Sequence, residues 1–544
     1  MSAKTVAIIG CGVSGITALK SCLEQGLDAT CYEMHDNIGG TWYYTKHIRD
    51  EQGPGIYDFL ITNTSREMMR FSDFHFPQNT PVFPQHQDVH NYLCEYAQHF
   101  NLFSHIQFNT KVLSLNKSPT YDTTGRWIIQ TTKSDSKSAD DIDTKEYDNV
   151  IISTGFQRHP FIPDIEGLSD FKGTYTHSQT FKNGDPYKDK RVLVIGEFMM
   201  GNFNMYPSFL CAMPNSALDV SVGIAESAEQ VYLSVGAGCW VCPRNAEGIP
   251  IDTLIHRRVW KLFPAFLNRI MRRVSEANFN HTEFCIRPAR GPIHYTGTVN
   301  DDLGSRIASG KIKVVSGTVK FLPNGAKLDD GTEIQDIDAI IFATGFRPDH
   351  SLLGQEHVMN AYKRVFPIDL PKHSLALVGM LGSNTPTGPV SEMQSRIAAM
   401  TFAGKHRLPE RKIMQADNER WEKIKTDYYG PKKLLWPTLR LMDEIAEEIG
   451  VRPHFSNVFW KSPTVALQIV FGPAFSAHYR LQGDGATKEA VNDCLKAWKL
   501  TTQGAKLRKL PPLQKDRFSL PVPPFYHLML FTIIVFCMAI LIVA

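Results

Sequence analysis

The sequence has little excess charge of either sign. Its 58 lysine and arginine residues stand against 55 aspartate and glutamate residues, which gives a formal net charge of +3. No basic face stands out from this balance, so the usual footprint of a nucleic-acid-binding protein is missing. The sequence also lacks internal repeats and a signal-peptide pattern. We therefore expect a globular, cytosol-facing protein whose 544 residues form two or three domains.

Cysteine clusters are scarce. Ten cysteines are spread along the chain, and the close pair is Cys239 and Cys242. This spacing is used in redox and zinc sites, but no second such pair and no nearby histidine pair completes a metal set. Alternation along a strand explains the pair better. We predict reduced thiols, no metal site and no nucleophilic triad.

What the chain does have is a dinucleotide-binding pattern in residues 4–33. An apolar strand runs into a glycine turn, a helix follows, and a second strand ends at Glu33. Gly10 allows the tight turn, Gly12 lets the backbone approach a pyrophosphate, and Gly15 lets the helix pack closely on the sheet. An acid at Glu33 accepts hydrogen bonds from ribose hydroxyls and favours FAD or NAD over NADP. The predicted cofactor-binding turn is Gly10, Cys11, Gly12, Val13, Ser14 and Gly15.

Two further segments are candidates for the same site. Thr41 and Trp42 follow a glycine pair soon after Glu33. Residues 62–65 form the polar run Thr-Asn-Thr-Ser within apolar sequence, and a buried polar run needs partners. A flavin ring edge would supply them, but Ser65 also precedes the helical sequence REMM and could cap it. Both interpretations stay open.

The chain between the candidate sites alternates strands and helices. Residues 88–100 have helical periodicity, residues 106–130 predict strands, and residues 134–145 predict an exposed hairpin tip. Two buried strands, residues 149–155 and 339–345, both end in Thr-Gly. We interpret these as chain crossings between two nucleotide-binding domains.

A second glycine turn follows the strand RVLVI, and it is degenerate. Gly196 and Gly201 hold the first and third glycine positions, but Phe198 occupies the second, where its ring blocks a pyrophosphate. Pro207 and Pro214 then interrupt the helix that should follow.

The next strand ends in an uncharged turn, Gly236 and Ala237, where an NADP site would normally carry arginines. Arg244 is close enough in sequence to substitute, but an ordinary surface arginine is the alternative. The missing charges predict weak binding of a phosphorylated dinucleotide.

The C-terminal part is helical from about residue 410 and ends in an uncharged apolar run, residues 525–544. About 20 apolar residues suffice to cross a bilayer, and lysines and arginines between residues 506 and 517 suit a cytosolic flank. We predict a C-terminal membrane anchor.

Together these features resemble the flavin-containing monooxygenases, in particular the membrane-anchored, dimethylaniline N-oxide-forming animal enzymes, over nearly the full chain. The most specific match is residues 171–181, FKGTYTHSQTF, which fits the family's FxGxxxHxxx[FY] identifier. The resemblance makes His177 part of the linker between the nucleotide domains, and Phe181 favours this group over the Baeyer–Villiger enzymes. Further matches are Glu33, Thr41 and Trp42, Asn63 to Ser65, residues 342–346, residues 391–394 and the apolar tail.

The resemblance implies an α/β fold with two Rossmann-like domains, a helical C-terminal region and one C-terminal transmembrane helix. The FAD-binding domain would comprise residues 1–155 and 331–450, and residues 156–330 would form the NADPH-binding-like domain. Residues 451–520 would be the helical region, and residues 525–544 the anchor. It also implies location at the endoplasmic reticulum membrane with the catalytic domains in the cytosol, and leaves homo-oligomerisation open.

The implied reaction uses NADPH to reduce FAD, adds O2 at flavin C4a, and transfers one oxygen atom from the hydroperoxide to a soft nitrogen or sulfur nucleophile of a small molecule. Asn63 matches the asparagine that helps to hold this intermediate with NADP+, and we take it as the catalytic residue. The cofactor-binding candidates are residues 10–15, Glu33, Thr41, Trp42, Thr62, Asn63, Thr64, Gly196, Gly201 and Gln394. The degenerate second turn leaves an alternative: a flavoprotein that binds FAD but accepts hydride poorly or not at all and acts by binding. Neither interpretation identifies the substrate.

Overall fold

The computed structural model describes residues 3–47, 53–135, 141–196, 215–295, 297–430 and 435–501. The chain divides into two compact units, Met1–Gly504 and Ala505–Ala544, and every described residue belongs to the first. Phe198, Gly201 and the predicted anchor at residues 525–544 lie outside the described residues. Among the helices that are described, none has the length and apolar character that crossing a bilayer requires.

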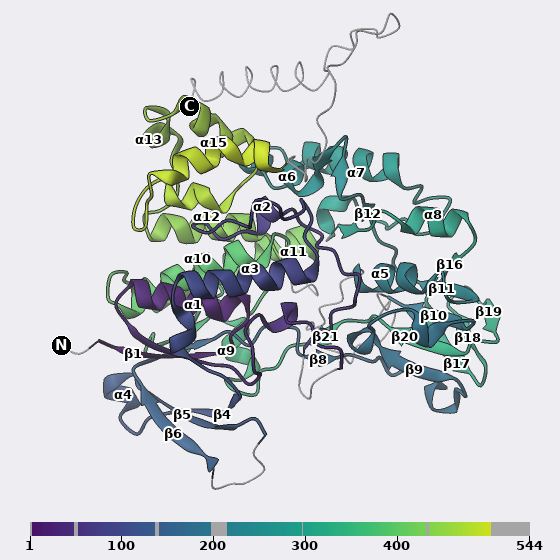
Figure 1. Cartoon of the computed structure of the whole chain (residues 1–544), viewed down its shortest axis with the longest axis horizontal. Coiled ribbons are helices and arrows are strands. Elements are labelled where there is room, and N and C mark those ends of the chain that lie inside the picture. Colours follow the sequence, from purple (N-terminus) through teal and green to yellow (C-terminus); the bar gives the residue numbers. More distant parts are fainter. Residues whose placement is uncertain are drawn as a thin grey trace, which may run out of the picture. The chain divides into compact units, whose positions relative to one another are not determined.

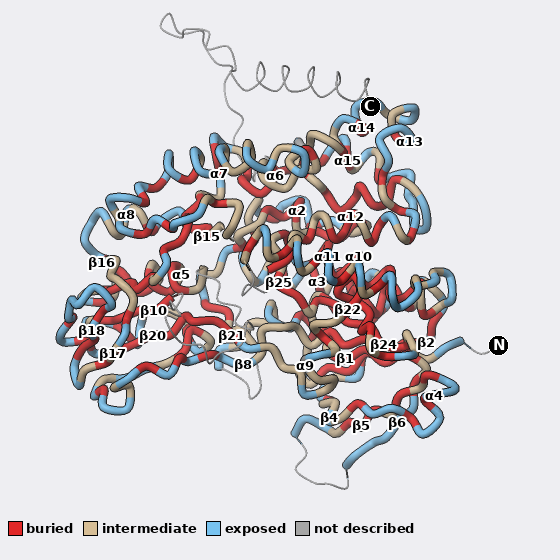
Figure 2. Tube along the Cα trace, turned by 180° about the vertical axis from the view of Figure 1, so that it is seen from behind, coloured by how far each residue is buried: buried red, intermediate tan, exposed pale blue. Residues whose placement is uncertain are grey.

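The first sheet is built around the strand that precedes the glycine turn. Its five parallel strands are, in spatial order, β24 (Leu375–Leu377), β7 (Asn149–Ile152), β1 (Thr5–Ile9), β2 (Asp28–Tyr32) and β3 (Ile106–Gln107). Val6 pairs with Ala29 on one side and with Asn149 on the other. A strand covered on both faces needs a continuous apolar run, which β1 supplies. Figure 2 shows these central strands buried.

The two faces of this sheet carry different layers. Helices α1 (Val13–Glu24), α3 (His86–His99) and α10 (Thr387–Phe402) cover one face through a shared apolar core. The antiparallel strands β4 (Thr110–Lys117), β5 (Trp127–Lys133) and β6 (Asp143–Tyr147) cover the other. Figure 1 shows the helices above the sheet and the three strands below it. The helix and strands expected between residues 88 and 130 are present.

The second sheet repeats this design. Its parallel strands are, in spatial order, β16 (Ile312–Val315), β11 (Gln230–Ser234), β10 (Arg191–Ile195), β20 (Ala339–Phe342) and β9 (Thr174–His177). Helix α5 (Asn215–Ile224) packs on one face. A three-stranded antiparallel sheet packs on the other face, formed by β17 (Thr318–Leu322), β18 (Gly325–Leu328) and β19 (Glu333–Gln335).

The two segments in which the chain crosses between the sheets lie next to each other. After the two Thr-Gly pairs, β8 (His159–Pro160) and β21 (Phe346–Arg347) pair with each other in antiparallel register. Gly155 and Gly345 both have positive φ, +76° and +87°, which permits the sharp change of direction at each strand end. The expected crossings therefore lie side by side. The predicted boundary at residue 330 is too early, because β20 still pairs with β10 in the second sheet.

Helices complete the described part of the chain. They are α11 (Arg411–Tyr429), α12 (Thr438–Glu448), α13 (Phe455–Phe459), α14 (Pro463–Phe471) and α15 (Glu489–Thr501). The side chains of Leu441 and Ile445 in α12 join the core beneath α10. At the end of α15 the chain returns to the N-terminal half, where Arg66 Nη2 donates to Leu500 O at 3.3 Å.

His177 ties the end of β9 to the second crossing. Its Nε2 lies 3.0 Å from Gly345 O, and its Nδ1 accepts from the Gln179 N–H at 3.1 Å. These partners fix the neutral ring with the proton on Nε2, since a protonated Nδ1 could not accept. Burial lowers the pKa of His177 to about 4.

We expect His177→Gln to remove part of the acid sensitivity of folding. Between the ordinary histidine pKa of about 6.5 and the folded value, the unfolded chain binds a proton that the folded chain does not, so stability falls as the pH falls. From pH 7.5 to 4.5 the wild type should lose about 2 kcal/mol more of its free energy of unfolding than the variant, measured by urea unfolding. The exposed His159→Gln is the control, and parallel curves for wild type and His177→Gln would contradict the assignment.

Candidate functional site

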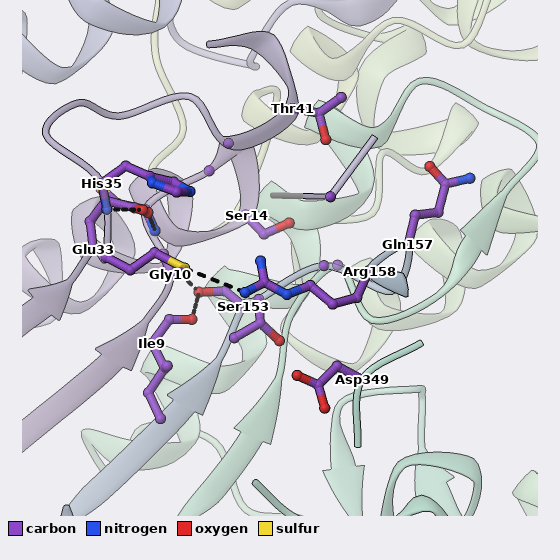
Figure 3. Close-up of a pocket in the computed structure, with 18 of the residues that line it drawn as sticks. Ile9, Gly10, Ser14, Glu33, His35, Thr41, Ser153, Gln157, Arg158 and Asp349 are labelled. Atoms are coloured by element: carbon purple, nitrogen blue, oxygen red, sulfur yellow. Dashed lines mark hydrogen bonds between the residues drawn. The ribbon is translucent and has the colours of Figure 1, made fainter. Parts of the chain in front are cut away.

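A cavity of about 750 Å³ lies at the carboxyl end of the first sheet. Its lining includes the glycine turn, Glu33, the pair Thr41 and Trp42, and the segment after β7. Figure 3 shows Glu33 and His35 on one side of the turn and Gln157, Arg158 and Asp349 on the other. This is the edge of an open α/β sheet where ligands bind.

The three glycines of the turn differ in how much space a side chain would have at each position. Gly10 has φ +93°, and a Cβ on Gly15 would lie 1.9 Å from Gly10 O, so both glycines are required by the fold itself. A Cβ on Gly12 would meet no protein atom closer than Gly40 Cα, at 3.6 Å. Gly12 is also the residue before α1, and no side chain caps that helix. The fold thus leaves open space at a helix N-terminus that has no side-chain cap, where an anionic group would lie.

Glu33 ends the second strand and is buried against this turn. Its Oε2 accepts from Cys11 N at 2.8 Å, and its Oε1 accepts from His35 N at 2.9 Å. Burial raises the pKa of Glu33, and these two donors together with Arg158 partly counteract that rise. Because a carboxylate has about four acceptor sites, Glu33 retains capacity to accept from a ribose hydroxyl.

Arg158 is a lining residue that the sequence interpretation missed. It follows the first crossing strand, and Figure 3 shows its side chain extending toward the glycine turn. Its Nη2 lies 3.4 Å from Met34 Sδ. A guanidinium beside an uncapped helix N-terminus suits a phosphate. In the sequence, Arg158 could have been identified as a positively charged residue three positions after a strand that ends in Thr-Gly.

Two more cavities continue from the first. The second, of about 390 Å³, shares Thr41 and Trp42 with it and is lined by Thr62, Asn63 and Thr64. The third, of about 540 Å³, also has Asn63 and Thr64 in its lining, together with Ser383 and Thr385, which line the second. Asn63 therefore lies where the second and third cavities meet.

The polar run at residues 62–65 has partners within the protein. Ser65 stands at the N-cap of α2 (Arg66–Met69), yet its side chain does not cap that helix. Instead, its N–H and Oγ donate to Asp252 Oδ2 at 2.6 and 2.9 Å. Side-chain capping by Ser65 is therefore wrong. Asp252 was missed, although an acid within the apolar run IPIDTLI was an available signal.

Arg244 is neither a surface arginine nor a free phosphate ligand. Only 15% of its side chain is exposed, and Nη1 pairs with Asp301 Oδ2 at 2.9 Å. Its Nε donates to Thr62 O at 3.1 Å, and its Nη2 donates to Asn63 Oδ1 at 3.2 Å. The Arg244 guanidinium, which belongs to the segment between β11 and β16, thus holds the polar run at residues 62–65.

A buried acid, Asp252, and a half-buried acid, Asp219, face these cavities. Asp252 lines the third cavity, its Oδ1 has no partner among the described residues, and burial raises its pKa to about 6. Asp219 lines the second cavity and accepts from the Tyr57 hydroxyl and from Asn300 Nδ2, the latter at 2.9 Å. Burial also raises the pKa of Asp219.

Other predicted residues lie elsewhere. Gln394 is wrong as a direct contact, because it lines none of the three cavities and both ends of its amide bind backbone. Its Oε1 accepts from Gly379 N at 2.9 Å, and its Nε2 donates to Arg364 O at 3.1 Å. It therefore supports Gly379, which does line the first cavity. Gly196 directly follows β10, and its N–H donates to Ser234 O at 2.9 Å. Gly201, the other glycine predicted for this turn, lies outside the described residues.

The cysteine pair lies in the protein interior. Cys239 and Cys242 are buried, and Cys242 Sγ lies 3.1 Å from Ser275 Oγ. Within the described ranges, no group of three or more His, Cys, Asp or Glu residues could hold a metal ion.

The chain is similar to known proteins along its whole length. A family profile described as "FMO-like: Flavin-binding monooxygenase-like" matches residues 3–544. Flavin-containing monooxygenase 5 of Rattus norvegicus is 35% identical over 502 residues, which cover 89% of this chain and 90% of that protein. Dimethylaniline monooxygenase (N-oxide-forming) 2 of Macaca mulatta is 34% identical over 541 residues, which cover 96% of each.

Solved structures share the fold. S-allyl-L-cysteine S-oxygenase from Allium sativum superposes with a TM-score of 0.59 at 20% identity and covers 92% of this chain and 99% of its own. Cyclohexanone monooxygenase from Rhodococcus sp. Phi1 bound to NADP+ has a TM-score of 0.57 at 17% identity and covers 82% and 98%.

Proposed function

The chain belongs to the flavin-binding monooxygenase-like family, and from this premise we propose that it uses FAD and NADPH to transfer one oxygen atom of O2 to a soft nitrogen or sulfur nucleophile of a small molecule. Flavin-dependent monooxygenation itself follows from the family and from relatives named flavin-containing monooxygenases. The observation that carries the choice of FAD is the open space at Gly12 beside Glu33.

The residues of the first two cavities fit FAD. The glycine turn and Arg158 would hold the pyrophosphate, and Glu33 would accept from ribose hydroxyls. The second cavity would then receive the flavin ring, with Thr62, Asn63 and Thr64 at its edge. When bound, the flavin supplies the reaction with O2, while the chain orients the reactants and excludes water.

We expect Gly12→Val to abolish flavin binding without unfolding the chain. A Val side chain has room against the protein but would fill the space for the pyrophosphate. The measurement is the flavin absorbance of purified protein per chain, with circular dichroism as the check on folding.

Gly304→Ala is the control outside the site, since its Cβ would meet the Phe279 ring in ordinary contact at 3.4 Å. Stoichiometric flavin in a folded Gly12→Val protein would refute the FAD site. A colourless wild type that cannot be reconstituted with FAD would refute the proposed function.

Weak NADPH binding is the second part of the proposal. Phe198 replaces a glycine, and the turn after β11 carries Gly236 and Ala237 instead of cations. Loss of about 3–4 kcal/mol of phosphate contacts weakens binding roughly 150- to 900-fold. Turnover would then be slow, and poorly retained NADP+ would let reducing equivalents escape as H2O2.

Phe198→Gly combined with Gly236→Arg and Ala237→Arg should lower the KM for NADPH at least tenfold and reduce H2O2 released per NADPH oxidised. Dimethylaniline is the probe substrate, and the three-site change is compared with Phe198→Gly alone. Micromolar NADPH affinity with full coupling in the wild type would overturn the prediction. Absence of flavin reduction by NADPH and NADH would favour the alternative, a flavoprotein that acts by binding.

We also propose anchorage in the endoplasmic reticulum membrane through residues 525–544, with the catalytic part in the cytosol. The support is the uncharged run and the cationic residues before it. Deleting residues 525–544 should move the protein from the membrane to the soluble fraction with its flavin retained. A full-length protein that is soluble without detergent would exclude this anchor.

A further inference from the structure

Arg244 gives its hydrogen bonds to three consecutive residues of one loop. Besides Thr62 O and Asn63 Oδ1, its Nη2 lies 3.4 Å from Ile61 O. On its opposite side, Asp301 accepts from the Arg244 backbone N–H at 2.9 Å and from Nη1 at 2.9 Å. All three guanidinium nitrogens are therefore engaged, and a fixed fork of five N–H donors suits such a set better than a lysine.

These contacts determine which way the Asn63 amide points. A guanidinium has donors only, so the Asn63 atom beside it must be the amide oxygen. The Nδ2 donors then point away from Arg244, and within the described residues Nδ2 makes no hydrogen bond. Asn63 lines the second and third cavities, so a donor without a protein partner is available where the two meet.

The loop has few other means of fixing Asn63. Thr62 N donates to Pro84 O at 2.9 Å, and Ser65 is held by Asp252, but neither contact reaches the Asn63 side chain. Without Arg244 the amide could rotate and present its oxygen to the cavities. An acceptor there would lose any interaction that needs a donor.

We propose that Arg244 is the positioning residue that holds the Asn63 amide with its Nδ2 donor toward the junction of the second and third cavities. This inference rests on the proposed function, in which the flavin ring occupies the second cavity with Asn63 at its edge. It argues against Arg244 as a 2′-phosphate ligand, because four of its five side-chain N–H donors are already used. It also explains why a largely buried arginine reaches the loop at residues 61–65.

The test compares Arg244→Ala, Arg244→Lys and the control Arg306→Ala in the full-length, flavin-loaded protein. Arg306 lies, like Arg244, between β11 and β16; it belongs to α8 (Leu303–Ala308) and pairs with Glu226. We expect hydrogen–deuterium exchange of a peptide covering residues 61–65 to quicken about tenfold in Arg244→Ala, which corresponds to about 1.4 kcal/mol. Arg244→Lys should lie between, and Arg306→Ala should match the wild type.

Kinetics with NADPH and dimethylaniline give the second measurement. Arg244→Ala should lower kcat about tenfold and raise the H2O2 released per NADPH, with the KM for NADPH changed less than twofold. In an Asn63→Ala background, Arg244→Ala should add no further loss, because both changes remove the same positioned amide.

Three results would overturn the inference. Unchanged exchange in residues 61–65 would show that Arg244 does not hold the loop. A tenfold rise in the KM for NADPH with coupling retained would make Arg244 a phosphate ligand. Fully additive losses in the double variant would show that Arg244 acts apart from Asn63. If the wild type contains no flavin or shows no oxygenation, the proposed function is refuted instead. The exchange measurement still decides whether Arg244 holds the loop at residues 61–65.

Discussion

The antiparallel pairing of β8 with β21 is the constraint on which the other parts depend. The chain leaves the first sheet after Gly155 and returns after Gly345, and both passages meet in this ladder. His177 adds a hydrogen bond from β9 to the returning strand. Because both passages start at the carboxyl ends of parallel strands, the ends that bind ligands lie close to the crossing. The second cavity, which Asn63 lines, has residues of both passages in its lining, Gln157 and Gly345.

The two sheets share one design, which no sequence repeat revealed. In each, a strand ending in Thr-Gly pairs with the strand that leads to a glycine turn. Each sheet also has helices on one face and a three-stranded antiparallel sheet on the other. The likeness lies in topology and burial, so apolar side chains can be exchanged freely while the layers persist. The first turn keeps all three glycines, and the second does not. A fold can therefore be retained after part of a binding motif has changed.

Sequence reasoning succeeded where the structural cause is local. The glycine turn, helix α3 and the Thr-Gly strand ends depend on neighbouring residues and were predictable. The roles of Arg244 and Asp252 were not, because their partners lie more than 180 positions away along the chain. Gln394 was misplaced for a related reason: a buried helix shows which residues are near a site but not which face meets it. The boundary at residue 330 failed because β20 and the strand it resembles, β7, belong to different sheets.

The buried charges around residues 61–65 favour function over stability. Burial raises the pKa of Asp252 to about 6, so keeping it ionised at neutral pH opposes folding, and the two donors of Ser65 offset this only in part. Its Oδ1 lacks a partner among the described residues, which adds a desolvation cost. Apolar residues of similar size would stabilise such a site better. Instead, a carboxylate and a guanidinium from the segment between β11 and β16 hold the loop at residues 61–65. The Asn63 side chain is therefore held by a residue that reaches it only when this segment packs against the loop.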